Sequence, residues 1–177
     1  MRDLRYNLDS RDQLDAEGNV IRWIHDVPLK VTCMVWRANL GRLPTACELI
    51  KRGVTIATPI CSYCGNEDED VTHVLWRCSM AKTVWLWVFK WCDIPIPDVH
   101  DVSEILSFVE TWSNDPNRKR NLLCICYGTL WMIWKVRCDW IFKKARISPT
   151  KVADNIKAIV YTWVKYRRSK CFYKWEE

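Results

Sequence analysis

Apolar residues recur with a helical period along most of the chain, so the pattern predicts helices. The first clear run starts at Pro28, because a proline at the first position of a helix loses no hydrogen bond. Its inner face is predicted to hold the residues at i, i+4, i+7 and i+11, which are Leu29, Cys33, Trp36 and Leu40. Gly41 is expected to end this helix, since glycine readily adopts the left-handed conformation found after helix ends.

A second, shorter helix is predicted after the corner at residues 42–44. Thr45 and Glu48 have the spacing of a capping box, in which the threonine hydroxyl and the glutamate carboxylate each bond a backbone N–H of the other residue. Gly53 stands where a glycine after the helix end belongs. Residues 54–60 are then expected to be extended.

The same spacing predicts the remaining helices. A short helix at residues 73–78, with Cys78 just past its end, is expected to precede one at 79–91 capped by Ser79. The inner face of the longer helix is predicted to hold Met80, Val84, Trp87, Val88 and Trp91. Prolines 95 and 97 indicate a linker, and helices over 103–112, 116–145 and from 149 onward follow. The last two each begin with a capping residue and a proline.

Composition is typical of a packed globular chain of one to one and a half domains. The chain has 177 residues, 49% of them hydrophobic, with twelve tryptophans and only five glycines. Its charge is uneven: residues 1–115 carry 12 Lys and Arg against 17 Asp and Glu, whereas residues 116–177 carry 15 against 4. A polyanion would therefore meet the C-terminal part.

Cysteine usage indicates a reducing, intracellular setting. The chain has ten cysteines, but its charged start resembles no secretory signal, so clustered cysteines are interpreted as metal ligands and scattered ones as small apolar residues. The exposed loops are expected to hold His25 and His100. No membrane contact is expected, because the longest weakly charged run, residues 121–134, is shorter than the roughly 20 apolar residues that a bilayer requires.

Residues 61–78, here called the knuckle, carry the strongest chemical motif. The spacing is C-x2-C-x8-H-x4-C, formed by Cys61, Cys64, His73 and Cys78. Three thiols and one imidazole complete a tetrahedral shell for one structural Zn²⁺, with no position left for a water. The alternatives are a redox pair or unrelated core residues, and Cys92 is an alternative ligand. The predicted fold class is all-α: a helical domain built around this small zinc knuckle, followed by a helical tail.

With these residues laid out, the chain resembles the zinc-binding domain C-terminal to the polymerase in plant non-LTR (LINE-type) retrotransposon proteins. In the first half the matching pieces are Val27-Pro28-Leu29-Lys30, Trp36-Arg37, Arg42-Leu43-Pro44-Thr45, Arg52-Gly53, Cys61-x-x-Cys64, Glu69, His73, Cys78, Ala81 and Val84-Trp85. In the tail they are Trp131–Arg137, Phe142, Trp163 and Arg167. The sequence departs from the usual pattern at Asp70 and Cys138, neither of which is a proposed ligand.

The resemblance implies a parent protein with an endonuclease and a reverse transcriptase upstream, an RNA-directed DNA polymerase located in the nucleus. This chain lacks the clustered aspartates that two-metal nucleotidyl transfer requires, so it is expected to be non-catalytic, a fragment or a free-standing remnant. Its predicted organisation is a lead-in at residues 1–26, a zinc-binding domain at 27–92 and a basic helical tail at 93–177.

The tail supplies the candidate contacts to RNA or DNA. The acidic residues 67–70 of the knuckle would repel phosphate, so the contacts are predicted at basic residues after Pro116 instead. These are Arg118, Lys119, Arg120, Lys143, Lys144, Arg146, Lys165, Arg167, Arg168 and Lys170. The alternative is a protein-interaction or scaffolding module, in which zinc only joins helices and the basic residues are solvated helix ends.

Overall fold

The computed structural model describes residues 13–14, 20–21 and 23–168, and nearly all of the described chain lies in helices and their connections. The elements are β1 (Gln13–Leu14), β2 (Val20–Ile21), α2 (Leu29–Asn39), α3 (Ala46–Lys51), η1 (His73–Arg77), α4 (Ser79–Cys92), α5 (Val102–Trp112), α6 (Pro116–Lys143) and α7 (Pro149–Arg168). The only strands in the described residues are two-residue segments that pair antiparallel, with Gln13 opposite Ile21. The all-α prediction is therefore confirmed.

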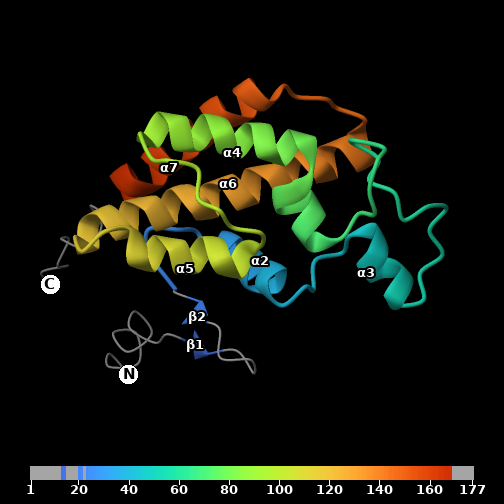
Figure 1. Cartoon of the computed structure of the whole chain (residues 1–177), viewed down its shortest axis with the longest axis horizontal. Coiled ribbons are helices and arrows are strands. Elements are labelled where there is room, and N and C mark those ends of the chain that lie inside the picture. Colours follow the sequence, from blue (N-terminus) through green and yellow to red (C-terminus); the bar gives the residue numbers. More distant parts are fainter. Residues whose placement is uncertain (1–12, 15–19, 22, 169–177) are drawn as a thin grey trace, which may run out of the picture.

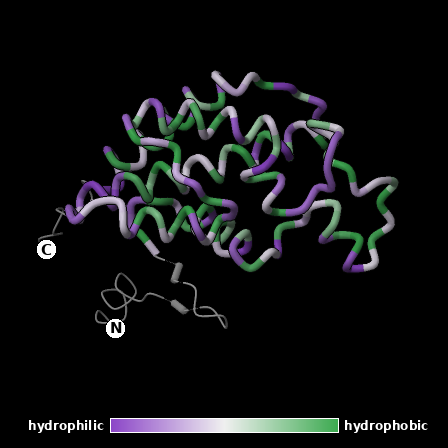
Figure 2. The backbone as a smooth tube through the Cα atoms, in the orientation of Figure 1, coloured by the Kyte–Doolittle hydropathy of each residue, from purple (hydrophilic) through white to green (hydrophobic). Residues whose placement is uncertain are grey.

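The long helix α6 is the centre of the molecule. It packs against α7, α2, α5, η1 and α4, and α4 also packs on α7. In Figure 1 α6 runs through the middle of the bundle, with α4 and α7 on one side and α5 and α2 on the other. Figure 2 shows hydrophobic and hydrophilic residues alternating along the bundle helices, as expected for helices with one buried side.

One hydrophobic core joins the helices before and after residue 92. It contains Val35 of α2, Leu75 of η1, Phe89 of α4, Ile133 of α6 and Ile156 of α7, all fully buried. The α6–α7 contact is close at one glycine: a Cβ added to Gly128 would lie 2.7 Å from Val160 Cγ2. The zinc knuckle and the C-terminal helices thus pack on one another.

No described helix is long and apolar enough to cross a membrane.

Several predicted helix ends are confirmed. Thr45 Oγ1 accepts a hydrogen bond from the Glu48 N–H at 3.5 Å, and Asp115 accepts one from the Asn117 N–H at 2.8 Å. Gly41 follows the end of α2 with φ of 62°. The reciprocal half of the capping box is wrong, because the Glu48 carboxylate pairs with Lys51 Nζ at 2.6 Å instead. The capping role of Ser79 is also wrong, since it is the first residue of α4 and Cys78 precedes it.

The predicted inner face of α2 is wrong. Leu29 is 63% exposed and Trp36 is 37% exposed, whereas the buried residues are Val31, Thr32, Met34, Val35 and Ala38. The helix carries two apolar stripes, and contact with α6 and α5 selects the second one. Lys30 on the flank of that stripe places its ammonium group 5.6 Å from the centre of the Trp131 ring.

The predicted inner face of α4 is partly wrong for the same reason. Trp87 and Trp91 are exposed, and Trp85 and Phe89 are buried in their place. The indole N–H of Trp85 donates to the Leu75 carbonyl at 2.9 Å, and its ring packs on Phe89 at a centroid distance of 5.5 Å. An indole that can satisfy its N–H inside the protein is the one that becomes buried.

Candidate metal centre

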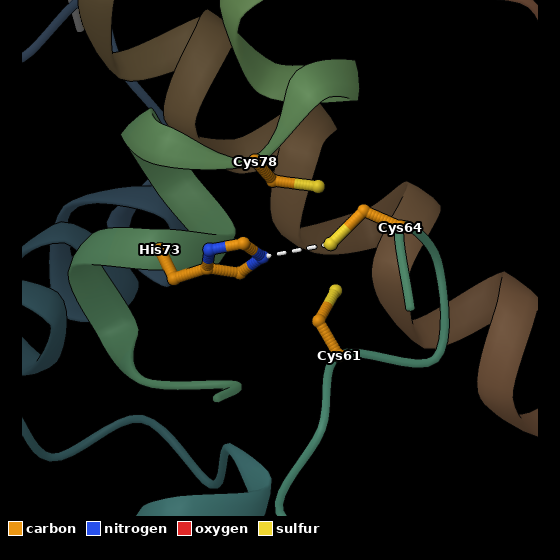
Figure 3. A group of neighbouring side chains, drawn as sticks. All are labelled: Cys61, Cys64, His73 and Cys78. Carbon is orange, nitrogen blue, oxygen red and sulfur yellow. Dashed lines mark hydrogen bonds between the residues drawn. The ribbon is translucent and has the colours of Figure 1, made fainter. Parts of the chain in front are cut away.

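The structure brings the four predicted ligands together. The ligand atoms of Cys61, Cys64, His73 and Cys78 all lie within 4.8 Å of one another, and Cys64 Sγ is 3.3 Å from His73 Nε2. Figure 3 shows all four side chains pointing toward a common centre. A tetrahedral zinc with bonds of about 2.0–2.3 Å sets its ligand atoms about 3.3–3.8 Å apart. The cluster therefore fits one structural zinc ion with a closed set of four ligands.

A tight turn presents the first two thiols. The Gly65 N–H donates to the Cys61 carbonyl at 2.8 Å, and Gly65 has a φ of 74°, which favours glycine. The Cys61 N–H donates to the Glu67 carbonyl at 2.7 Å, and an antiparallel bridge joins Ile60 to Asp68. Cys61 and Cys64 are thus held at the two ends of a turn that closes on itself.

A π-helical turn presents the other two ligands. Helix η1 spans His73–Arg77, and the Cys78 N–H donates to the His73 carbonyl at 2.7 Å, five residues back. In an α-helix the residue at i+5 points well away from residue i, because five steps of about 100° each overshoot one turn. The wider turn brings Cys78 back over His73. The four residues between His73 and Cys78 were the sequence signal for a π-helical turn. The sequence analysis predicted a short helix there but not its wider turn.

The Glu67 carboxylate orients the imidazole of His73. Its Oε2 lies 3.1 Å from His73 Nδ1, and the ring is fully buried. With Nδ1 donating its proton to Glu67, Nε2 presents its lone pair to the thiols. This is the arrangement that fixes a histidine ligand in one tautomer.

Asp70 holds the start of the ligand-bearing helical segment. Its Oδ1 accepts the His73 backbone N–H at 2.6 Å, and its Oδ2 accepts Arg77 Nη2 at 2.7 Å. Asp70 and Glu67 are therefore both engaged in building the site. The sequence predicted only that the acidic residues 67–70 repel phosphate, but the structure shows that they also stabilise the knuckle.

Glu69 joins the knuckle to the bundle through a buried ion pair. Its Oε1 accepts the Ala46 N–H at 3.0 Å and Arg137 Nε at 3.2 Å, and Arg137 Nη2 bonds the same oxygen. Both side chains are buried, and the guanidinium lies 4.9 Å from the centre of the Trp134 ring. Sequence reasoning missed this pair: both residues lay in the pieces that carried the family resemblance, but nothing in the sequence linked them.

The pKa values of two of the ligand thiols are shifted in opposite directions. The hydrogen bond with Cys78 lowers the pKa of Cys61 to about 4, although burial acts in the opposite direction. The same hydrogen bond, together with burial, raises the pKa of Cys78. Because zinc binds cysteines as thiolates, acid competes with the metal for these ligands.

The other cysteines and histidines of the described residues are not part of this cluster. Cys92, the alternative ligand, is not part of it, and burial raises the pKa of its thiol to about 11. Burial likewise raises the pKa of Cys124 to about 12. His25 and His100 are exposed, as predicted, and Cys171 lies outside the described residues.

Residues 5–85 match the model of a family described as zinc-binding in reverse transcriptase. The match spans all four clustered residues and covers slightly less than half of the chain. The matching family is thus a zinc-binding one, and the resemblance stated from the sequence is supported to that level. Searches of curated proteins and of solved structures returned no match.

At least five of the nine predicted nucleic-acid contacts that the structure describes are engaged within the protein. Arg120 and Arg168 both bind the fully buried Asp26, at 2.6 Å to Oδ1 and 2.9 Å to Oδ2. Arg167 donates to the His25 carbonyl at 3.2 Å. Arg118 and Lys143 have acidic partners on α6 or at its cap, Asp115 at 3.8 Å and Asp139 at 2.6 Å.

The remaining predicted contacts differ in their surroundings. Lys144 and Arg146 are exposed and lie over aromatic rings, as does Lys165. Lys119 is partly buried in the first turns of α6. Lys170 lies outside the described residues. The basic residues predicted to contact nucleic acid thus differ in how exposed they are and in whether they already form ion pairs within the protein.

Proposed function

We propose that this chain is a non-catalytic, zinc-binding accessory module of a LINE-type retrotransposon reverse transcriptase. The observation that carries the proposal is the closed Cys3His cluster inside the stretch that matches a family of zinc-binding domains of reverse transcriptases. Four protein ligands fill a tetrahedral shell and leave no site for a reacting water, so the metal has a structural role.

The proposed parent is a plant element, with its polymerase core upstream and its site of action in the nucleus. The support is the ordered set of sequence pieces that resembles such elements, from Val27 to Arg167. In this proposal residues 27–92 form the zinc-binding domain and residues 93–177 its basic tail. The polymerase core is the protein partner.

The proposed task is to hold template RNA or target DNA beside that core. The support is the net excess of 11 positive charges after residue 115. The test is fluorescence-polarisation binding of RNA and single-stranded DNA to the zinc-loaded chain across a salt series. Binding at low salt that weakens linearly in log–log form is expected. A folded, zinc-loaded chain that binds neither nucleic acid at low salt would overturn this role.

A scaffolding role is the second candidate, and one observation favours it. Three large apolar side chains of α4, namely Leu86, Trp87 and Trp91, are 40–48% exposed. Aromatic residues of this kind are enriched where proteins meet. The same titration separates the two candidates, because a scaffold of this kind would leave both nucleic acids unbound.

A further inference from the structure

An aromatic and basic surface lies where the knuckle meets the end of α6. Tyr63 stands between the ligands Cys61 and Cys64, and its ring meets that of Trp140 at a centroid distance of 6.2 Å, edge to face. The Arg146 guanidinium lies 4.6 Å from the Trp140 ring centre and 5.7 Å from that of Tyr63. Lys144 Nζ lies 5.9 Å from the Trp140 ring centre. These four residues are called the knuckle–α6 platform.

The two cations of the platform are available to a ligand. Lys144 and Arg146 are exposed, and within the described part of the chain neither forms an ion pair. At the opposite end of the bundle, Arg120 and Arg168 are held by Asp26. Unpaired exposed cations keep their full charge for phosphate, whereas ion-paired ones have to exchange one partner for another.

The carboxylates closest in sequence to the platform are already compensated. Asp139 bonds Lys135 at 2.7 Å through Oδ2 and Lys143 at 2.6 Å through Oδ1, and these bonds lower the pKa of its carboxyl group. Glu67 is directed at His73 on the other flank of the metal cluster. Asp139 and Glu67 therefore both have partners within the protein, which reduces their repulsion of phosphate at the platform.

The metal loop holds the platform in place. The Trp140 indole N–H donates to the Ser62 carbonyl at 3.0 Å, and the Tyr63 hydroxyl donates to the Ile147 carbonyl at 3.4 Å. Ser62 and Tyr63 are the two residues between the first pair of ligands, so the zinc loop is joined both to the C-terminal end of α6 and to the connection between α6 and α7. The rings and the guanidinium are therefore preorganised, which lowers the entropic cost of stacking.

We propose that the knuckle–α6 platform binds single-stranded RNA or DNA, with a base stacked on the Arg146 guanidinium above Trp140 and flanking phosphates on Lys144. Guanidinium planes and aromatic rings stack any base, and nearby cations follow the backbone. This inference deepens the nucleic-acid role proposed above and rests on it. It places the contact beside the zinc site and away from the start of α6.

The test compares two matched double variants of the full, zinc-loaded chain. Lys144→Gln with Arg146→Gln removes two charges from the platform. Arg118→Gln with Lys119→Gln removes two charges from the other end of α6, about 37 Å away along its axis at a rise of about 1.5 Å per residue. Fluorescein-labelled oligouridylate, oligothymidylate and a duplex of matched length serve as probes across a salt series. Zinc content and the thermal midpoint are measured for each variant.

The platform variant is expected to lose at least about tenfold in affinity for the single strands. Its salt slope should fall by about 0.7, because only Lys144 of the two removed cations contacts phosphate. The control variant is expected to lose less than about threefold. Equal losses in the two variants, or no loss in the platform variant while the parent chain binds, would overturn the platform and leave the proposed function intact. A parent chain that binds no probe would overturn both.

Two further arms test the stacking and the source of the strand. Arg146→Lys keeps the charge but loses the planar face, so a loss of about threefold or more relative to the parent chain is expected. Full affinity in this variant, or equal affinity for duplex and single strand, would contradict base stacking. Oligouridylate and oligothymidylate together tell whether RNA, DNA or both are held, because only RNA presents a 2′-hydroxyl.

Discussion

The knuckle and the bundle around α6 are stabilised by different means. Residues 52–70, which lead into the knuckle and form its metal-binding turn, contain no helix, and apolar residues such as Val54 and Ile60 are 38–46% exposed. Along α6, by contrast, Leu130, Ile133 and Val136 are fully buried. Residues 52–70 bury too little apolar surface to offset their own loss of conformational entropy, so they need a metal and buried polar contacts. The helical part of the knuckle instead shares one hydrophobic core with the bundle, through residues such as Leu75.

Several contacts join the knuckle to the bundle. They include the Glu69–Arg137 ion pair, the packing of η1 on α6 and α4, and the hydrogen bond from Trp140 to the Ser62 carbonyl. We therefore expect residues 52–70 to depend on zinc for their fold, whereas the bundle around α6 folds without it.

Removal of one zinc ligand is expected to unfold the knuckle. Cys64→Ser replaces a thiolate whose Sγ lies 3.3 Å from His73 Nε2, and structural zinc contributes about 10–16 kcal/mol in short zinc-finger peptides. The variant should bind less than one zinc per chain by mass spectrometry under native conditions. Hydrogen exchange should then accelerate at residues 54–78 and stay slow at residues 122–137.

Cys92→Ser is the matched control, because Cys92 is a thiol outside the cluster. It should keep one zinc and the slow exchange of the knuckle. A Cys64→Ser chain that still holds one zinc would contradict the assigned ligands. Loss of protection in both regions at once would show that the knuckle and the bundle unfold as one unit. That result would contradict a bundle that folds without zinc.

Breaking the buried ion pair is expected to be the next largest effect. Arg137→Met leaves the buried Glu69 carboxylate without its cation, at a cost of about 3–5 kcal/mol in the free energy of unfolding. Urea denaturation of the zinc-loaded chain, followed by tryptophan fluorescence, measures it. Lys135→Met breaks an exposed pair with Asp139 on the same helix and should cost less than about 1 kcal/mol. Equal costs would mean that Glu69 finds another partner or becomes solvated.

The corrected face of α2 is tested by two truncations. Met34→Ala removes a buried side chain and should cost about 2–5 kcal/mol, whereas Leu29→Ala removes one that is 63% exposed and should cost less than about 0.5 kcal/mol. The same urea titrations compare the two. The reverse order would restore the face predicted from sequence and would separate α2 from the core built on α6.

Local spacing was sufficient for most of the fold. Helix positions and several caps, such as Thr45 and Asp115, depend on residues within three positions of each other, and these were predicted correctly. The buried faces of α2 and α4 were not, because each helix offers two apolar stripes and contact with distant helices decides between them. Period alone cannot distinguish Trp85 from Trp87 when both are flanked by apolar residues.

The site shows the same division between local and distant contacts. The four metal ligands lie within one short stretch of sequence, so their spacing alone was enough to predict that they cluster. The partners of Glu69 and Asp26 are Arg137, Arg120 and Arg168, which lie 68, 94 and 142 residues away. A single sequence carries no signal for such pairs. For that reason the sequence could not show that Arg120 and Arg168, which it predicts as nucleic-acid contacts, also bind a buried aspartate.

The Glu67 carboxylate offers the finest test, because it supports a ligand without being one. Glu67→Gln keeps the size of the side chain but removes the charge that bonds His73 Nδ1 at 3.1 Å. Loss of such a partner lowers metal affinity about 10–100-fold, so the zinc dissociation constant should rise by that factor in competition with a chromophoric chelator. Asp68→Gln, an exposed acid of the same loop without this bond, should change it less than about threefold. If both variants raised the zinc dissociation constant equally, the acidic loop would act only through its overall charge. The hydrogen bond from His73 to Glu67 would then contribute nothing of its own to metal binding.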